Sequence, residues 1–396
     1  MITDFVFNSQ SVTAGHPDRL CDIVSDAIID AFLRQDQTSR ITAECALSKN
    51  ILFLAARYAS EAVVDIPETA RKVIKKIGYR LEDFNADECT VVTSLIEQNK
   101  TVRETDLTAL EDDELDQITV SHQASVFGYA CTHTPDLMPL PVSLANALAR
   151  QLRLVRQNGT LSYVSPDCTT QVGVEFIGGA PKRIHAITLI IGCENQDYLP
   201  TLMQMEEDLR HHVIAPVFEH AWIRPDNLTK IVINPDGPFV RSGPAAHSGM
   251  TGRKGDSDTY GSFARHSGSA LSGKSPSRID RVGAYAARYA AKNIVAAGLA
   301  EQCEVQLSYS IGHAGPVSVL LNTHGTGKLD DHEIRKRLLR HFDFRLGAII
   351  RDLKLRQLPQ QHKGVYYQQL PIIGHFGEHP LSLPWEATDK AGLISA

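Results

Sequence analysis

The chain has 396 residues, of which 43% are hydrophobic and 22% charged, a composition typical of a globular protein with room for two or three domains. The formal net charge of −6 argues against general nucleic-acid binding, and no apolar run reaches the length of a membrane span. Seven cysteines are scattered without a C-x-x-C pair, and the first residues lack the basic-then-apolar pattern of a secretory leader. We therefore expect a cytoplasmic protein with reduced cysteines, no zinc site, no membrane association and no nucleic-acid partner.

The first hundred residues alternate between strands and helices. Residues 5–12 predict a short strand, and the turn at 14–18 leads into a helix whose apolar residues recur at helical spacing as far as residue 32. His16 and Asp18 would then lie at a helix N-terminus, where the dipole and free N–H groups favour an anion. The alternative is that Asp18 only caps the helix while His16 packs beside it. The other expected elements are strands at 40–47 and 50–58 joined as a hairpin, a helix at 66–77 and a strand at 89–95.

Residues 101–117 are polar and acidic and show no apolar period. We predict a mobile loop over 101–121, which is either a lid over a pocket or a surface excursion. After it, strands and helices alternate again, and the chain ends in an irregular tail rich in His, Pro and Gly. The expected helices are 141–154, 198–213, 280–297 with Gly298 as its stop, and 331–342, and the expected strands are 170–176, 183–191, 230–234, 305–311 and 318–323.

The most informative stretch runs from 242 to 280, where glycines and hydroxyl residues recur. Glycine allows backbone N–H groups to approach an anion closely, and interleaved cations neutralise the charge of that anion. A polyphosphate is the expected ligand, and a flexible solvated linker is the alternative. The segment is not a P-loop, because Ser272-Gly-Lys-Ser lacks the upstream glycine that a Walker A loop requires. The cations are Arg253, Lys254, Arg265, Lys274 and Arg278.

Strands and helices recur three times, at roughly 110 to 130 residues, which is an ordinary domain size. We expect an α/β (α+β) fold with an N-terminal domain at 1–100, the loop at 101–121, a central domain at 122–232 and a C-terminal domain at 233–396. The glycine-rich segment belongs to the last domain. The turn at 234–239 should bring Phe239 close to it.

Short motifs along nearly the whole chain resemble those of one enzyme family. Together and in this order they are far more specific than any single motif, and they identify the chain as a member of the S-adenosylmethionine synthetase (methionine adenosyltransferase) family. The motifs are Gly15-His16-Pro17-Asp18, Phe127-Gly128-Tyr129-Ala130, Ile233-Asn234-Pro235, Thr251-Gly-Arg-Lys254, Asp258-Thr-Tyr-Gly, Ala264-Arg265-His266, Ser272-Gly-Lys274, Ile279-Asp280-Arg281, Ala284-Tyr-Ala-Ala-Arg-Tyr and Gly374-His375-Phe376-Gly377.

The resemblance implies three similar sheet-and-helix domains around a pseudo-threefold axis. It also implies a homodimer or homotetramer with the active site between subunits. In the family reaction the sulfur of methionine attacks C5′ of ATP and expels triphosphate, which is then cleaved to phosphate and pyrophosphate. Mg²⁺ and K⁺ are the implied cofactors. Triphosphate leaves readily only when its charge is neutralised in a preorganised site, a role that suits the glycine-rich segment.

The resemblance also implies roles for individual residues. The residues expected to hold the triphosphate, and therefore to be catalytic, are His16, Lys254, Arg265 and Lys274. The implied magnesium carboxylates are Asp18 and Asp280, and Glu44 is the implied potassium ligand. The implied substrate-binding residues are Phe239 beside the adenine, Gln98 and Asp258 at the amino-acid head group, and Arg278, with Arg57 and His122 at positions where the family has carboxylates.

The chain departs from the family motifs mainly around the nucleophile. Gln10, Arg57 and His122 replace acidic residues of the family, while Thr169 replaces a lysine and Ser275 an aspartate. Reversed charge near the ammonium group of methionine would weaken its binding, so poor turnover of methionine is predicted. Three hypotheses follow: adenosyl transfer to methionine, which we take as the default, transfer to another small nucleophile, and a non-catalytic regulatory role.

Overall fold

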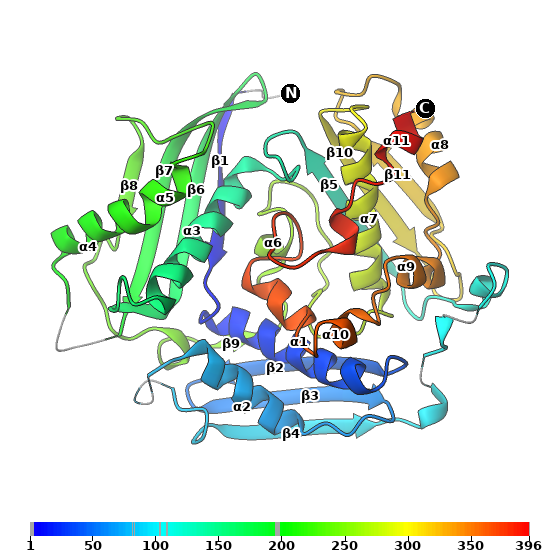
Figure 1. Ribbon diagram of the computed structural model, residues 1–396, viewed down its shortest axis with the longest axis horizontal. Coiled ribbons are helices and arrows are strands. Elements are labelled where there is room, and N and C mark those ends of the chain that lie inside the picture. Colours follow the sequence, from blue (N-terminus) through cyan, green and yellow to red (C-terminus); the bar gives the residue numbers. More distant parts are fainter. Residues whose placement is uncertain are drawn as a thin grey trace.

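The computed structural model describes residues 4–395 except positions 81, 83, 103, 108–109 and 195–198. Three sheets lie towards the outside, and the long helices α1 (Pro17–Gln35), α3 (Leu140–Gln157) and α7 (Ile279–Ala296) lie towards the centre (Figure 1). A shorter helical segment accompanies each long helix. These segments are α2 (Ile66–Ile77), the run α4 (Leu202–Leu209), η4 (Arg210–Ile214) and α5 (Ala215–Phe218), and α8 (Asp331–His341). The structure therefore has the expected three units of sheet and helix.

Each sheet contains a strand from a distant part of the chain. The first has the order β4 (Thr90–Glu97), β3 (Ile51–Ala59), β2 (Arg40–Ser48), β9 (Gly249–Met250). The second has the order β1 (Phe5–Val12), β6 (Val164–Ile177), β7 (Ala180–Cys193), β8 (Lys230–Ile233). The third has the order β11 (Ser318–Asn322), β10 (Gln302–Tyr309), β5 (Ala124–Cys131). Because β1, β5 and β9 cross between units, the segment boundaries drawn from the sequence do not coincide with the sheets and remain a prediction.

Close packing of helix on strand explains the alanine-rich sequence of α7. The helix is buried along almost its whole length and lies against β5. A Cβ atom on Gly128 of β5 would lie 1.9 Å from the backbone carbon of Ala287, so only glycine fits at this contact. One hydrophobic core joins the first and third units, and a second core fills the unit built on α3.

Most predicted elements are confirmed, with small shifts at their ends. The prediction of one regular helix at 198–213 is wrong at its start and in its last turn. The helix α4 begins at Leu202, and the turn at Arg210–Ile214 is a π-helix. Tyr198 lies outside the described residues. Pro216 follows that turn and has no N–H with which to continue a regular ladder. The strand β5 was not expected from periodicity.

The tail is more ordered than its sequence predicts. It forms α9 (Leu346–Asp352), α10 (Leu358–Gln361), η6 (Tyr367–Ile372), η7 (Pro384–Glu386) and α11 (Ala391–Ser395). Much of this segment lies between the long helices in Figure 1, and the side chains of Tyr366, Tyr367 and Trp385 are fully buried. These helices are too short to show a helical period, so burial in the core determines them.

The loop between the first two units contains only short turns in its described part. These are η1 (Lys100–Val102) and η3 (Glu114–Gln117), of which the second packs against α9. Positions 103 and 108–109 lie outside the described residues, so the lid hypothesis remains a prediction. Within the described ranges, none of the helices combines the length and the apolar character that crossing a bilayer requires.

Candidate functional site

The first cluster of predicted site residues lies at the N-terminus of α1. The glycine-rich segment passes so close that a Cβ on Gly249 would lie 2.1 Å from the backbone carbon of Pro17. The amide of Met250 donates to Asp18 Oδ1 at 3.0 Å. Lys254 Nζ lies 3.8 Å from Asp18 Oδ2. The structure therefore brings Asp18 and Lys254 together although more than two hundred residues separate them.

His16, and not Asp18, is the N-cap of α1. Its Nδ1 accepts the amide of Asp18 at 3.3 Å, and Pro17 occupies the first helical position. Capping by Asp18 was the alternative weighed from the sequence, and it is wrong, because the carboxylate is turned to the glycine-rich segment. Burial lowers the pKa of His16 to about 4, so the ring is neutral at neutral pH.

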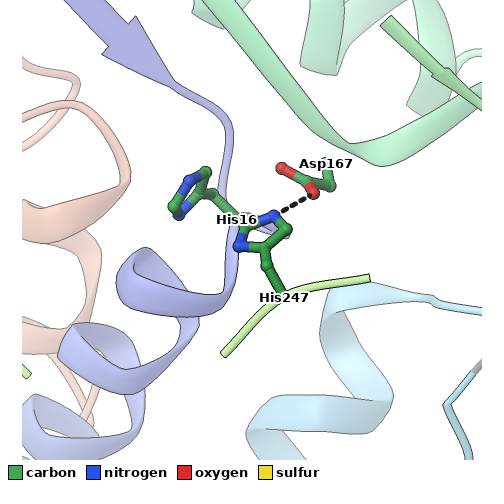
Figure 2. Close-up of side chains that lie close together, drawn as sticks. All are labelled: His16, Asp167 and His247. Carbon is green, nitrogen blue, oxygen red and sulfur yellow. Dashed lines mark hydrogen bonds and ion pairs between the residues drawn. The ribbon is translucent and has the colours of Figure 1, made fainter. Parts of the chain in front are cut away.

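A histidine and an aspartate that sequence reasoning did not single out lie beside His16. His247 Nε2 is 3.1 Å from Asp167 Oδ2, and this hydrogen bond raises the pKa of His247 (Figure 2). The rings of His16 and His247 are 4.8 Å apart between centroids. Asp167 lies two residues before Thr169, which departs from a family motif, and this position was the signal in the sequence that could have drawn attention to it.

The second cluster lies at the start of α7. Asp280 Oδ2 is 3.1 Å from Lys274 Nζ and 2.7 Å from His122 Nε2. Burial by itself would raise the pKa of Asp280, but the positive charge of Lys274 and the contact with His122 outweigh it and lower the pKa. Burial lowers the pKa of Lys274 and of Arg278, with partial compensation by Asp280. His122 thus contacts a predicted magnesium carboxylate.

Further predicted residues share the outer face of the first sheet. Cross-strand partners project to the same face, and Thr42 of β2 pairs with Lys274 on one side and Arg57 on the other. Glu44 lies two residues along β2 on the same face. Gln98 follows the end of β4 and donates its amide to the carbonyl of Tyr58 at 2.7 Å. Arg57, Glu44 and Lys274 are thus neighbours on one face of the sheet, on which the side chain of Lys274 is only 15% exposed.

Three predicted residues take no part in the charge pairs of the two clusters. Asp258 is 1% exposed and forms an ion pair with Arg19, which places it in the interior. Arg265 forms an ion pair with Glu304, and its guanidinium lies 5.2 Å from the centre of the Phe127 ring. Phe239 is 37% exposed and its carbonyl accepts the amide of Cys193 at 2.9 Å, at the end of β7. Within one chain, therefore, the predicted site is divided.

The three units and the two clusters, in which lysines and carboxylates from distant segments meet, define the class as a multidomain α/β protein with paired charges at its candidate site. Family models match almost the whole chain: the S-adenosylmethionine synthetase N-terminal domain at residues 4–100, the central domain at 117–239 and the C-terminal domain at 241–387. The chain belongs to the S-adenosylmethionine synthetase family.

Curated relatives agree with this assignment. The S-adenosylmethionine synthase of Crocosphaera subtropica is 45% identical over 98% of this chain and 97% of its own length. That of Synechococcus elongatus is 44% identical over 100% of this chain and 98% of its own. The Gloeobacter violaceus synthase is also 44% identical, over 98% of this chain and 97% of its own length. The similarity extends through all three units, so the resemblance inferred from motifs is confirmed.

Proposed function

We propose that this chain is an ATP-dependent adenosyltransferase that forms S-adenosylmethionine. The bond between the methionine sulfur and C5′ of ATP forms as the bond from C5′ to the triphosphate oxygen breaks. Water then cleaves the triphosphate to phosphate and pyrophosphate. The full-length match to curated synthases carries the proposal. The comparisons give no support to another acceptor or to a non-catalytic role.

The leaving group would be stabilised by the cations of the two clusters. Lys254 and Lys274 are each held near a carboxylate, at 3.8 Å and 3.1 Å, so little reorganisation is needed when charge develops on the triphosphate. His16 and Arg278 would add donors for phosphate oxygens. The neutral state of His16 suits hydrogen bonding more than charge neutralisation.

The carboxylates suit the metal cofactors that we propose. Hydrogen bonds to Asp18 fall on Oδ1, whereas Oδ2 has Lys254 and His16 only at 3.8 Å. In the described part of the chain, the contacts of Asp280 fall on Oδ2. Each carboxylate thus keeps one oxygen for a hard cation, and bound Mg²⁺ would supply further charge neutralisation on the triphosphate. Glu44, on an exposed face, would hold K⁺.

We further propose a homodimer or homotetramer in which two copies complete each site. The two clusters lie at different places on one chain, and the face that carries Arg57 and Glu44 is open. Apolar side chains that are 43 to 56% exposed lie on that same face. Burying them against a second copy would also cover the site residues beside them. They are Ile51, Phe53, Val92, Ile96 and Met250.

Product analysis tests the proposal. The purified chain, ATP, methionine, Mg²⁺ and K⁺ should give S-adenosylmethionine, phosphate and pyrophosphate in equal amounts. A kcat/KM for methionine of about 10⁴ M⁻¹s⁻¹ or more would be ordinary for an enzyme. It would also overturn the expectation, drawn from Arg57 and His122, of poor turnover. Binding of ATP without any product, over a panel of sulfur nucleophiles, would contradict the proposed activity.

A further inference from the structure

Three segments of the chain meet at the cluster of His16, Asp167 and His247 shown in Figure 2. His16 precedes α1, Asp167 belongs to β6, and His247 precedes β9. One nitrogen or oxygen donor atom from each residue lies within 4.8 Å of the other two. Donors bound to one first-row metal ion at about 2.0 to 2.2 Å are roughly 3 to 4 Å apart, so small side-chain movements would close this cluster around an ion.

Backbone contacts fix the segments that carry these side chains. The amide of Gly15 donates to the carbonyl of Pro166 at 3.0 Å, which joins the start of α1 to β6. The amide of Gly243 donates to Asp167 Oδ2 at 2.7 Å, the same oxygen that faces His247. Among the described residues, no hydrogen bond falls on Asp167 Oδ1. The carboxylate is therefore oriented by its surroundings and retains a free oxygen, as metal-binding carboxylates do.

His16 has a carboxylate beside its ring. Asp18 Oδ2 lies 3.8 Å from His16 Nδ1. Ligation through Nε2 would place the imidazole proton on Nδ1, where Asp18 Oδ2 could accept it after a small movement in a state with no Mg²⁺ on that oxygen. The long 3.3 Å hydrogen bond from the Asp18 amide would be given up. A carboxylate behind a ligating imidazole commonly fixes its orientation.

The exposed fractions of the three side chains suit an ion that can exchange with solvent. The side chains of His16 and Asp167 are 12% and 9% exposed, whereas that of His247 is 43% exposed. An ion could thus enter from the His247 side, and three protein ligands would leave positions open for water or for an oxygen of a substrate.

We propose that His16, Asp167 and His247 bind one divalent transition-metal ion, such as Zn²⁺ or Co²⁺. Imidazole nitrogens favour these ions, whereas Mg²⁺ favours the all-oxygen surroundings assigned above to Asp18 and Asp280. The cysteine spacing predicts no zinc site. That spacing carries no information on this cluster, because the cluster forms only when distant segments of the chain meet. The proposal does not require ATP or adenosyl transfer, and an ion held by His16 would take the place of the hydrogen bond from His16 to a phosphate oxygen.

Co²⁺ titration of the metal-free, full-length protein tests the proposal, with visible absorption as the readout. We expect one Co²⁺ per chain, retained in excess Mg²⁺ and displaced by Zn²⁺. His247→Gln removes one ligand at a partly exposed position and should raise the Kd for Co²⁺ on the order of 100-fold. His266→Gln is the matched control, because His266 lies in the same glycine-rich segment and its Nδ1 contacts the carbonyl of Ser267 at 2.8 Å. The His266→Gln variant should bind Co²⁺ with the same Kd as the wild type.

His247→Asp replaces the nitrogen ligand with a carboxylate oxygen at the same position. It should retain Co²⁺ with an altered absorption spectrum, and circular dichroism shows whether each variant is folded. The proposal is overturned if the wild type gives no saturable spectrum below millimolar Co²⁺. It is equally overturned if folded His247→Gln binds as tightly as the wild type, which would mean adventitious binding by other histidines. Product formation with Mg²⁺ alone, measured separately, decides the proposed function and not this site.

Discussion

Lys274 is largely buried, and burial disfavours the charged form of its side chain. Burial lowers its pKa, and the carboxylate of Asp280, 3.1 Å away, only partly restores it. An anion placed beside such a cation gains more than it would at the surface, since few water molecules compete for the charge. The same reasoning applies less strongly to Arg265, whose side chain is 54% exposed.

Lys274→Ala should therefore weaken binding of a non-hydrolysable ATP analogue in the presence of Mg²⁺. It should also lower kcat by about 10²- to 10³-fold, the usual effect of removing one group that stabilises developing charge. Calorimetry and steady-state kinetics measure the two effects. Lys182→Ala, a change at an exposed lysine of β7, is the control and should leave both unchanged. Equal affinity in Lys274→Ala and the wild type would remove Lys274 from the proposed site.

His133 should contribute to a loss of stability in acid. It packs against Phe176 and Phe263, and burial lowers its pKa from 6.5 to about 4. Between these values the unfolded chain binds a proton that the folded chain does not, so the free energy of unfolding falls as pH falls. His133→Phe removes the group that binds this proton. Between the two pKa values, the slope of the free energy of unfolding against pH should therefore fall by about 1.4 kcal/mol per pH unit. Urea unfolding at several pH values from 4 to 7 measures the slope, and identical slopes would contradict the assignment.

At the scale of single elements, sequence patterns predicted those whose packing is regular. Apolar periodicity located α2 correctly at Ile66–Ile77, where Asp65 caps the start and Gly78 ends the helix with φ of 81°. Periodicity failed for β5 and for the tail, whose conformations depend on contacts with α7 and with the core. The motifs identified His16, Lys254 and Lys274 but could not show their partners, because tertiary contacts decide those.

Two elements far apart in sequence, α1 and α7, are joined by a buried ion pair. Arg281 donates to both oxygens of Asp26 at 2.6 and 2.7 Å, and neither residue is exposed to solvent. The guanidinium also lies 4.7 Å from the centre of the Tyr367 ring. This contact connects the tail to both helices, so Arg281 supports the first and third units together.

Arg281→Leu should reduce the free energy of unfolding by about 3 to 5 kcal/mol, because it leaves the Asp26 carboxylate buried without its counter-charge. Chemical denaturation of the whole chain measures the loss. The exposed pair of Lys72 and Glu68 on α2, at 3.7 Å, provides the contrast, and Lys72→Leu should cost no more than about 0.5 kcal/mol. A similar loss of free energy of unfolding in both variants would mean that burial of the ion pair does not determine its contribution to stability.

For the whole molecule, the interleaving of β1, β5 and β9 explains why the segments cannot be separated. Each unit completes its sheet with a strand from another, and one core joins the first and third units. Three α/β units were predictable from the recurring pattern. The exchange of strands was not, since it depends on pairings more than a hundred residues apart. The pairing of β9 with β2 also holds the glycine-rich segment against the first unit.

Under the proposed assembly, a complete site depends on a second copy of the chain. On the outer face of the first sheet, Phe53 lies in one row with Met250, Ala46 and Val92, and it is 43% exposed. Phe53→Lys places a charge in the middle of that face, where burial against a second copy would be costly. We therefore expect a wild type of at least twice 43.6 kDa by light scattering at micromolar concentration, and dissociation of the variant.

The variant should also lose adenosyl transfer while keeping its circular dichroism spectrum, since Phe53 contributes little to the core of its own chain. Leu154→Lys is the control, because Leu154 is 52% exposed on α3, away from this face, and should change neither mass nor activity. An active wild-type monomer would overturn the shared site. A Phe53→Lys variant that keeps both its mass and its activity would place the interface between copies on another surface.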